Sequence, residues 1–300
     1  MTDDLIKTLL AICGEENVLE NEPLSRHTSF RIGGPARVFV TPPDEKSLSD
    51  VIKACDASGV KRFILGNGTN VLAADEGYDG VIIQIYKNFS EIKINGTKIK
   101  AGAGVLLSKL SSEAAGASLA GFEFASGIPG TLGGAVTMNA GAYGGEMKDV
   151  LTDVTVYVPG EGIKELDAAD LKLGYRTSVL KSTDMIVLSA GLQLEKGDEK
   201  AIRERIAELK EQRTSKQPLE YPSAGSTFKR PEGYFAGKLI MDSGLKGYCV
   251  GGACVSEKHC GFVINKGNAT AADVKELMDH IVKTVEEKYG VRLEPEILCI

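Results

Sequence analysis

Glycine is concentrated in one part of this chain, between residues 127 and 145. Seven of those 19 positions are glycine, and the whole chain has 35 glycines in 300 residues, against a usual share of about 7%. Glycine lets a backbone turn sharply or approach a ligand closely. We expect no regular helix or strand to tolerate so many, while Ile128, Pro129, Leu132 and Met138 argue against a flexible linker. The run predicts an ordered loop wrapped around a pyrophosphate.

Another glycine-rich segment, Gly66-Asn-Gly-Thr-Asn70, comes earlier in the chain and directly follows a predicted strand at 62–65. Such a strand end exposes several main-chain N–H groups in one place, which suits a phosphate. Taken alone, the segment is more typical of a plain connecting turn, because Gly-Asn-Gly is a common turn composition. Neither segment carries the G-x-G-x-x-G pattern in a βαβ setting with an acidic residue about 20 positions on. Together they favour a dinucleotide bound by some fold other than the Rossmann fold.

Hydrophobic patterns predict a chain of mixed helices and strands. The helix expected at 44–58 has one apolar face and Gly59 just past its end. Asn95-Gly96, between two alternating segments, favours a hairpin with a type I′ turn. Thr270 and Asp273 are expected to form a capping box on a helix that stops at Gly290. Further helices are expected at 1–14, 106–117 and 199–213, and further strands at 37–41, 80–86, 154–158, 185–194 and 293–300.

Charge and hydropathy exclude several classes of protein. The net charge is −6 and no long Lys/Arg run is present, which argues against a nucleic-acid partner. No stretch reaches the roughly 18 apolar residues of a membrane helix. Asp3 and Asp4 stand where a signal peptide would be basic. We therefore expect a cytoplasmic protein without membrane insertion.

The chain has six scattered cysteines, at 13, 55, 249, 254, 260 and 299. In the cytosol we expect all of them to be reduced thiols. The group of Cys249, Cys254, His259 and Cys260 matches no familiar zinc spacing. We interpret these cysteines as small buried apolar residues and expect no metal site.

The two glycine segments together resemble the FAD-binding elements of the vanillyl-alcohol-oxidase-like, or PCMH-type, flavoproteins. In chain order, the first glycine segment is Gly66–Asn70, and the second begins Ser126-Gly-Ile-Pro-Gly-Thr-Leu-Gly-Gly-Ala135. Four further stretches resemble one family of that group, the UDP-N-acetylenolpyruvoylglucosamine reductases, and follow in the family's order. They are residues 27–34, 174–178, 225–231 and 293–297. A length near 300 residues, without a long tyrosine-bearing insertion, resembles the family's type II form.

The resemblance implies an α+β protein that holds FAD without a covalent bond, because neither glycine segment contains a histidine. Two α/β subdomains of a PCMH-type fold, 1–85 and 86–200, would bind FAD, and an α+β domain, 201–300, would bind the substrate. NADPH is the implied co-substrate. The implied FAD-binding residues are Gly66, Asn67, Gly68, Thr69, Asn70, Ser126, Gly127, Ile128, Pro129, Gly130, Thr131, Gly133, Gly134, Asn139 and Ala140.

The implied reaction reduces the enolpyruvyl group of UDP-N-acetylglucosamine enolpyruvate to give UDP-N-acetylmuramate, a step of peptidoglycan precursor synthesis. Negative charge develops beside a carboxylate, so the reaction needs a cation, a partner for the enolate and a proton source. The resemblance assigns these roles to Arg176, Glu296 and Ser226. A guanidinium suits the first role because its planar fork pairs with both carboxylate oxygens.

Each of these three residues also has a simpler interpretation. Arg176 could be a solvated surface charge, Ser226 a turn serine after Gly225, and Glu296 an exposed strand residue, although we expect it to be partly buried. The surrounding motifs favour the catalytic interpretation. The candidates for binding the UDP-sugar, with Lys216 nearby, are Tyr175, Arg213, Lys229 and Arg230; many relatives carry asparagine at position 230.

Two other functions remain open on the sequence alone. Another PCMH-type FAD oxidoreductase would keep both glycine segments without needing Arg176, Ser226 and Glu296 together. A non-catalytic nucleotide-sugar-binding protein would need neither flavin nor Ser226. The oligomeric state is open.

Overall fold

The computed structural model describes residues 3–300 and has the mixed helix and strand content predicted for an α+β protein. Contacts divide the chain into two compact units. The first unit comprises residues up to Glu20, Val38–Asn67 and Gly80–Arg213, and the second comprises Asn21–Arg37, Gly68–Asp79 and Thr214–Ile300. Each unit has its own cluster of buried apolar side chains.

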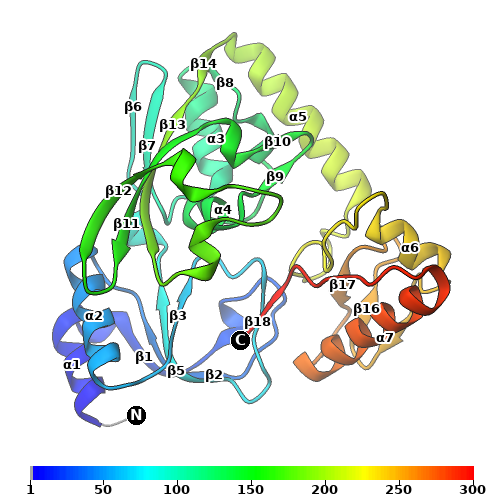
Figure 1. Ribbon diagram of the computed structural model, residues 1–300, viewed down its shortest axis with the longest axis horizontal. Coiled ribbons are helices and arrows are strands. Elements are labelled where there is room, and N and C mark those ends of the chain that lie inside the picture. The colour runs from blue at the N-terminus through cyan, green and yellow to red at the C-terminus, as the bar shows by residue number, and fades with distance from the viewer. Residues whose placement is uncertain (1–2) are drawn as a thin grey trace. The chain divides into compact units, whose positions relative to one another are not determined.

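The first unit contains a five-stranded antiparallel sheet, in the order β12-β11-β13-β7-β6 (Figure 1). Buried side chains such as Val154 and Val156 alternate along its long strands and fix one face against the core. The strands are β6 Ile92–Asn95, β7 Lys98–Gly102, β11 Leu151–Val158, β12 Gly162–Asp167 and β13 Ile186–Gln193.

A four-stranded sheet has the order β1-β2-β5-β3, and its strands β3 and β5 run parallel. The connection between β2 and β3 is helix α2, Glu45–Ala57. The Asp44 carboxylate caps α2 by accepting a 2.7 Å hydrogen bond from the Ser47 N–H. Helix α1, Asp3–Cys13, packs on α2 (Figure 1). The strands are β1 Val18–Pro23, β2 Pro35–Val40, β3 Arg62–Leu65 and β5 Tyr78–Gln84.

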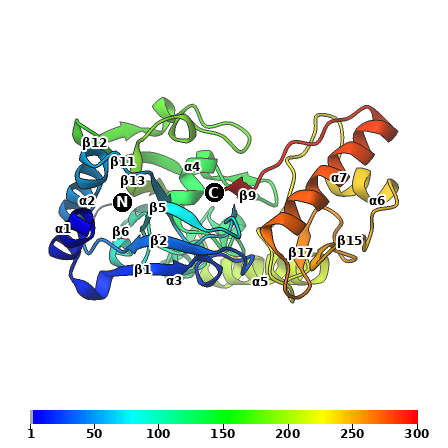
Figure 2. The ribbon, with the colours of Figure 1, turned by 90° about the horizontal axis from the view of Figure 1, so that it is seen from below.

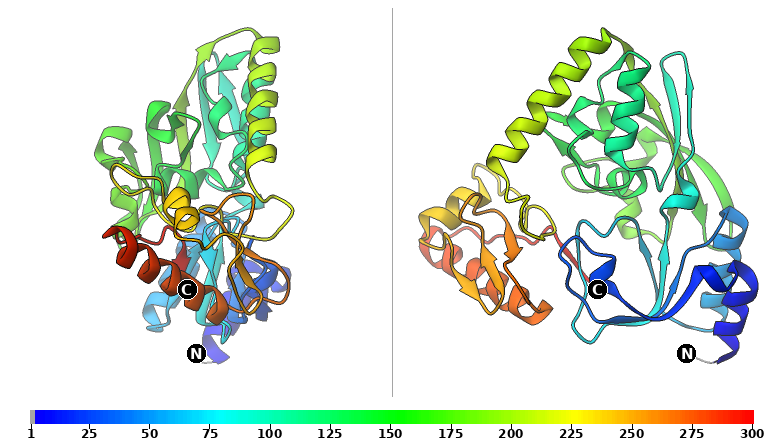
Figure 3. Two further views of the ribbon diagram at one scale, coloured as in Figure 1. Left: turned by 90° about the vertical axis from the view of Figure 1, so that its right-hand side faces the viewer. Right: turned by 180° about the vertical axis from the view of Figure 1, so that it is seen from behind.

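Shorter elements complete the first unit. Helix α3 packs on β8, and α4 packs on β13 (Figure 1); Figure 3 shows the ribbon from two further sides. The helices are α3 Leu107–Gly116, α4 Leu132–Met138 and α5 Glu199–Lys216, and the strands are β8 Leu119–Ala120, β9 Gly141–Ala142, β10 Gly145–Glu146 and β14 Glu195–Lys196. Single 3₁₀ turns lie at Glu15–Asn17, Lys87–Phe89, Glu123–Ala125, Met147–Asp149, Ala168–Leu171 and Val179–Ser182, and one at Leu24–Arg26 belongs to the second unit.

The second unit is a short antiparallel sheet, β15-β16-β17, packed against helix α7, as Figure 2 shows. Helix α7 begins with the predicted capping box of Thr270 and Asp273 and ends at Gly290, whose φ is 67°. The elements of the second unit are β4 Val71–Leu72, α6 Ala236–Asp242, β15 Cys249–Val250, β16 Ala253–Val255, β17 Val263–Asn265, α7 Ala271–Tyr289 and β18 Leu298–Cys299. Within residues 3–300, no helix is both long and apolar enough to cross a membrane.

The glycine-rich run does contain regular structure, so that expectation was wrong. Gly133 and Gly134 lie inside helix α4, and Gly141 and Gly145 lie in the paired strands β9 and β10. The reason is close packing. A Cβ on Gly133 would lie 2.9 Å from the Cβ of Ala103, and the Gly133 N–H donates to the Ala103 carbonyl oxygen at 2.8 Å.

Two predictions about strands were also wrong. The hairpin pairs Asn95 with Lys98, so its turn is Gly96-Thr97. Only Gly96 has a positive φ, of 61°, whereas a type I′ turn needs two such residues. The predicted strand at 293–300 is reduced to Leu298–Cys299. Pro295 has no N–H for a ladder and forms only one bridge, to Phe228.

The prediction that every cysteine is a free thiol was wrong. Cys249 and Cys254 form a disulfide. The hairpin of β15 and β16 places them directly opposite each other, which a reading of sequence spacing alone did not reveal. Cys13, Cys55, Cys260 and Cys299 are free.

Candidate active site

In the first unit, the two glycine segments meet. A Cβ on Gly66 would lie 2.5 Å from the Thr131 hydroxyl oxygen, so a side chain at position 66 would require that hydroxyl to shift. The Asn67 side-chain amide donates to the Pro129 carbonyl oxygen at 2.7 Å. The Gln84 amide donates to the Gly66 carbonyl oxygen at 3.2 Å. The end of β3 is therefore tied to the second glycine segment, as a shared ligand would require.

The second glycine segment is also fixed to the start of α3. Leu107 donates its N–H to the Gly130 carbonyl oxygen at 3.1 Å, and Leu132 donates to that of Val105 at 2.8 Å. The N–H groups of Gly130, Thr131 and Gly134 donate no hydrogen bond to any residue among 3–300. Fixed, unused N–H groups are the donors that a pyrophosphate accepts from. This donor set fits the phosphates of FAD.

Ser126, Gly127 and Ile128 begin this segment as a tight turn. Ser126 donates its N–H to the Glu123 carbonyl oxygen at 3.1 Å, and Ile128 donates to that of Ala125 at 3.0 Å. Gly127 lies against Arg213 of α5, whose Cδ would be 3.0 Å from a Cβ at that glycine.

Burial lowers the pKa of the Arg213 guanidinium. Within the described chain, this guanidinium makes no ion pair. A half-buried cation beside a glycine segment is suited to an anionic ligand. The structure thus brings Arg213 to the predicted FAD-binding residues rather than leaving it on the open surface.

Asn139 is fully buried, with a φ of 45°, at the end of α4. Its amide nitrogen donates to the Glu146 carboxylate at 2.6 Å and to the Gly174 carbonyl oxygen at 3.0 Å. Its amide oxygen accepts from the Lys148 N–H at 2.9 Å. The Asn139 side chain is thus hydrogen-bonded within the protein. Contact of Asn139 with FAD stays a prediction, and we expect it to involve the main chain. Ala140, next to it, donates its N–H to the Ala135 carbonyl oxygen at 2.8 Å.

Arg176 is held just beyond this polar cluster. Its φ is 54°, and its Nη2 donates to the Gly141 carbonyl oxygen at 3.0 Å. The guanidinium carbon lies 5.2 Å from the ring centre of Tyr175, which is 53% exposed. Asn139 binds the carbonyl of the preceding Gly174, so α4 and the β9–β10 hairpin together position this arginine. The guanidinium is half-buried, which separates it from a freely solvated surface charge.

In the second unit, Ser226 is exposed and follows Gly225, whose φ is 77°. The next residue, Thr227, is completely buried. Thr227 donates its N–H to the Gly261 carbonyl oxygen at 2.9 Å, and its hydroxyl accepts from the Val263 N–H at 2.9 Å. The sequence reading did not single out Thr227, although it belongs to the Gly225–Pro231 motif. It is the anchor that fixes Ser226.

Glu296 lies beside this anchor and is half-buried, as predicted. Its N–H donates to the Thr227 carbonyl oxygen at 2.9 Å. On its other side, the Asn70 amide donates to the Glu296 carbonyl oxygen at 3.0 Å, and Leu298 donates to the Asn70 carbonyl oxygen at 2.9 Å. The second unit thereby brings Ser226, Glu296 and Asn70 together along three adjacent backbone segments.

Gly68 packs against residues 27–34. These residues resemble a motif of the family, but no site residue was predicted among them. A Cβ on Gly68 would lie 2.0 Å from the His27 carbonyl oxygen. Ser29 donates its N–H to the Gly68 carbonyl oxygen at 3.0 Å, and its hydroxyl donates to the Ser223 carbonyl oxygen at 2.6 Å. Ser29 thus links the first glycine segment to residues 223–231, which we call the Ser226 segment. The N–H groups of Gly68 and Thr69 donate no hydrogen bond to the described residues.

The cations after Ser226 already have neighbours in the second unit. The Lys229 ammonium lies 3.0 Å from the Glu294 carboxylate. Arg230 lies over the Phe235 ring at 3.9 Å from its centre, and its Nε donates to the Tyr234 carbonyl oxygen at 3.2 Å. Both are beside Ser226 in sequence, but their contact with a substrate stays a prediction. Lys216 is exposed at the end of α5.

Two family models match this chain. An FAD binding domain matches residues 36–167, and the C-terminal domain of UDP-N-acetylenolpyruvoylglucosamine reductase matches 217–300. The chain is 50% identical over 300 residues to the UDP-N-acetylenolpyruvoylglucosamine reductase of Caldanaerobacter subterraneus subsp. tengcongensis, covering 100% of this chain and 99% of that one. It is 49% identical over 297 residues to that of Clostridium perfringens strain SM101, covering 99% and 97%.

Solved structures show the same likeness. The crystal structure of UDP-N-acetylenolpyruvylglucosamine reductase from Thermus caldophilus matches with a TM-score of 0.80 and 37% identity, covering 94% of this chain and 97% of that chain. Alkyldihydroxyacetonephosphate synthase matches with a TM-score of 0.50 and 14% identity over 65% of this chain, which shows a shared fold alone. The predicted α+β fold with an FAD-binding part is confirmed. This chain belongs to the UDP-N-acetylenolpyruvoylglucosamine reductase family.

Proposed function

We propose that this chain uses NADPH and FAD to reduce UDP-N-acetylglucosamine enolpyruvate to UDP-N-acetylmuramate. Membership of the family supports the reaction, the cofactor and the substrate. The structural observation that carries the proposal is the 2.9 Å hydrogen bond from the Glu296 N–H to the Thr227 carbonyl oxygen. It holds side by side the two segments that present an exposed hydroxyl and a half-buried carboxyl group, which are the proton source and the enolate partner that this chemistry needs.

FAD would be held by the two glycine segments, in which the N–H groups of Gly68, Thr69, Gly130, Thr131 and Gly134 donate no hydrogen bond to any residue among 3–300. When bound and reduced, it supplies the hydride that is added to the terminal carbon of the enolpyruvyl group. These unused N–H groups would balance the negative charge of its phosphates. No histidine lies in either segment, in keeping with non-covalent binding.

Arg176 would hold the substrate carboxylate through its planar fork of donors. One of its nitrogens already donates to the Gly141 carbonyl oxygen, which limits how the guanidinium can rotate. A fixed cation stabilises the charge that spreads into the carboxylate without having to reorganise during the reaction.

Ser226 would donate a proton to the carbon next to that carboxylate, and Glu296 would hydrogen-bond the developing enolate. A serine hydroxyl is a weak acid, so its position must be fixed relative to the strongly basic carbon it protonates. Thr227 supplies this fixation through its buried hydrogen bonds.

The UDP part of the substrate is assigned by charge and exposure. Lys229 and Arg230 are the third and fourth residues after Ser226 and would meet the two phosphates, with Arg213 as a further candidate. Tyr175, which is 53% exposed beside Arg176, would line the site. We also propose a division into three parts at residues 85 and 200 and a role in cell shape and division, because the family resemblance implies them. A cytoplasmic location is proposed from the charge and hydropathy of the sequence.

An anaerobic flavin assay tests this function. The purified holoprotein is reduced with NADPH, UDP-N-acetylglucosamine enolpyruvate is added, and the flavin spectrum is followed. Rapid reoxidation with formation of the lactyl ether is the expected result. A flavin that is reduced but ignores this substrate would indicate another PCMH-type oxidoreductase. A protein that cannot be loaded with FAD would overturn the proposal and favour a nucleotide-sugar-binding protein.

A further inference from the structure

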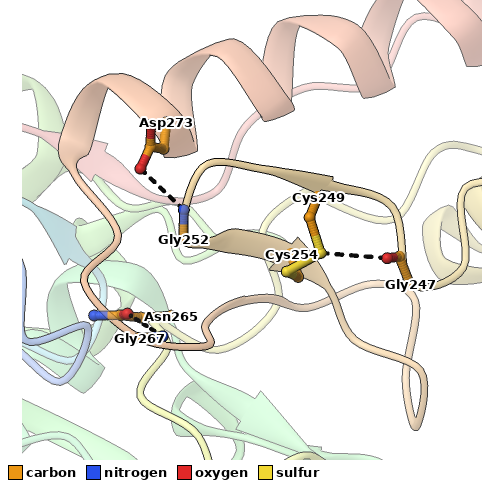
Figure 4. Close-up of a disulfide and its surroundings, with 7 residues drawn as sticks. All are labelled: Gly247, Cys249, Gly252, Cys254, Asn265, Gly267 and Asp273. Atoms are coloured by element: carbon orange, nitrogen blue, oxygen red, sulfur yellow. Dashed lines mark hydrogen bonds between the residues drawn. A yellow bond between two sulfur atoms is a disulfide. The ribbon is translucent and has the colours of Figure 1, made fainter.

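Cys249 and Cys254 face each other across the hairpin of β15 and β16, and Figure 4 shows their sulfur atoms joined. They are register partners in the sheet, and their Cα atoms are 4.1 Å apart. The hairpin holds them opposite each other through its own backbone pairing. The two thiols would therefore remain adjacent when the bond between them is open.

The two cysteines differ in exposure. Cys249 is exposed, whereas Cys254 is only 4% exposed and packs with Phe262 and Ile264. A thiol arriving from solution therefore reaches the Cys249 sulfur and not that of Cys254. An exposed entry thiol beside a protected resolving thiol is the arrangement that thiol–disulfide exchange uses.

Hydrogen bonds also hold the hairpin, in addition to this disulfide. The Gly252 N–H in its turn donates to the Asp273 carboxylate at 3.2 Å (Figure 4), and the Lys266 N–H donates to the Gly252 carbonyl oxygen at 2.9 Å. The bond spans a sequence separation of only 5, and short loops gain least from cross-linking. A reduced Cys249 would also find an acceptor, because its sulfur lies 3.3 Å from the Gly247 carbonyl oxygen.

We propose that Cys249 and Cys254 are a reversible dithiol–disulfide site that exchanges with low-molecular-weight thiols and disulfides. In oxidation, the Cys249 thiolate attacks a small disulfide, RSSR, and one RSH leaves. The Cys254 thiolate then attacks the Cys249 sulfur of the mixed disulfide, and the second RSH leaves. Two electrons pass from the protein thiols to RSSR, and two small thiols reverse the reaction. This site is independent of the proposed reductase activity.

The other cysteines do not offer this chemistry. Burial raises the pKa of the Cys13 and Cys55 thiols to about 11, which suppresses their thiolates. Cys260 is buried and free. Cys299 is exposed and free, so it can form only a mixed disulfide and serves as an internal control.

The site also lies close to the Ser226 segment within the second unit. Cys254 pairs with Ile264 of β17, and Ile264 forms a bridge to Ser223. Closing the bond holds the outer strand β15 to β16. We therefore expect oxidation to slow amide hydrogen exchange at residues 249–255 of the folded holoprotein.

Trapping tests the proposal. The holoprotein is reduced with dithiothreitol, which is then removed, and oxidised glutathione is added before alkylation and peptide mass analysis. In the wild type, we expect the disulfide between 249 and 254 to re-form, with glutathione retained on Cys299 alone. Cys254→Ala should retain glutathione on Cys249, because no resolving thiol remains. Cys249→Ser should leave Cys254 unmodified, because that thiol is buried.

The proposal would be overturned if wild-type Cys249 kept its glutathione while Cys254 stayed a thiol. It would equally be overturned if dithiothreitol opened the bond only after unfolding. The double variant Cys249→Ala/Cys254→Ala checks that the hairpin folds without sulfur. Its unfolding midpoint and hydrogen exchange should match those of the reduced wild type, and a failure to fold would show a structural disulfide instead.

Discussion

Gly66 and Thr131 approach so closely that a Cβ on Gly66 would lie 2.5 Å from the Thr131 hydroxyl oxygen. The next nearest atom, the Thr131 Cβ, would be at 3.7 Å, an ordinary contact. A single hydroxyl would thus have to shift to admit a side chain at position 66. The relationship joins the two glycine segments inside the first unit.

Gly66→Ala should destabilise the protein by about 1–3 kcal/mol, the usual cost of an overpacked site, and should weaken FAD retention. Thr131→Ala removes the clashing oxygen, so Gly66→Ala/Thr131→Ala should be more stable than the sum of the single changes predicts. Denaturant unfolding of all four proteins with FAD removed checks this. If the stability changes of the two single variants simply add up in the double variant, the Thr131 hydroxyl is not what destabilises Gly66→Ala.

Ser226→Ala should leave reduction of the flavin by NADPH intact and slow its anaerobic reoxidation by the enolpyruvyl substrate. A positioned general acid contributes on the order of 10²–10⁴-fold, and the loss should fall in that range. Ser223→Ala, three residues earlier in the same segment, is the matched control. Reoxidation that is unchanged in single-turnover mixing would remove Ser226 from the role of proton donor.

Thr227→Val should impair both stability and reoxidation, because it leaves the Val263 N–H without its 2.9 Å acceptor in a buried site. An unsatisfied buried donor costs about 1–3 kcal/mol. Thr227→Ser keeps the hydroxyl and should restore most of the reoxidation rate. If valine and serine behave alike in both unfolding and single-turnover assays, the hydroxyl does not position Ser226.

Local signals made much of the fold predictable from the sequence. Helix α2 lies where its apolar face and Gly59 predicted it, and α7 begins and ends at the predicted capping box and Gly290. These features depend on side chains within one or two turns of each other. The predicted position of the hairpin turn was wrong by one residue. The register of β6 and β7 is set by the alternating burial along both strands, and not by the Asn95-Gly96 dipeptide alone.

Long-range contacts explain what the sequence could not supply. Nothing local to Ser29 reveals that it binds carbonyl oxygens at 68 and 223. Nothing local to Cys249 and Cys254 reveals that a turn places them opposite each other. The candidate catalytic residues were found only through the family's motifs, and their roles stay predictions until the variants are measured.

Arg176→Lys should slow reoxidation by substrate and spare reduction by NADPH, because an ammonium cannot pair with both carboxylate oxygens. Losing one donor at a developing negative charge costs on the order of 10²–10³-fold. Lys181→Arg, on an exposed neighbour whose ammonium lies 3.4 Å from the Arg176 carbonyl oxygen, is a control for local charge changes. A lysine variant with the wild-type reoxidation rate would contradict the bidentate role.

Asp273 should make stability depend on acid pH. Hydrogen bonds from the main-chain N–H groups of Thr270 and Gly252 lower the pKa of its carboxyl group below its usual range. A lowered folded-state pKa contributes stability above the unfolded pKa, about 3.9, and that contribution is lost as pH falls through the folded-state value. The bonds tie the hairpin turn to the first turn of α7, so the loss should be felt across the second unit.

Asp273→Asn lacks this titration but can still accept a hydrogen bond, so comparing it with the wild type isolates the charge. The wild type should be the more stable of the two near pH 6, and the difference should shrink steadily below about pH 4. Urea unfolding from pH 6 to pH 3 measures it, with Asp279→Asn on the exposed side of α7 as the control. A difference that stays constant over this range would show that the carboxylate charge does not stabilise the junction, because protonation would then have removed nothing.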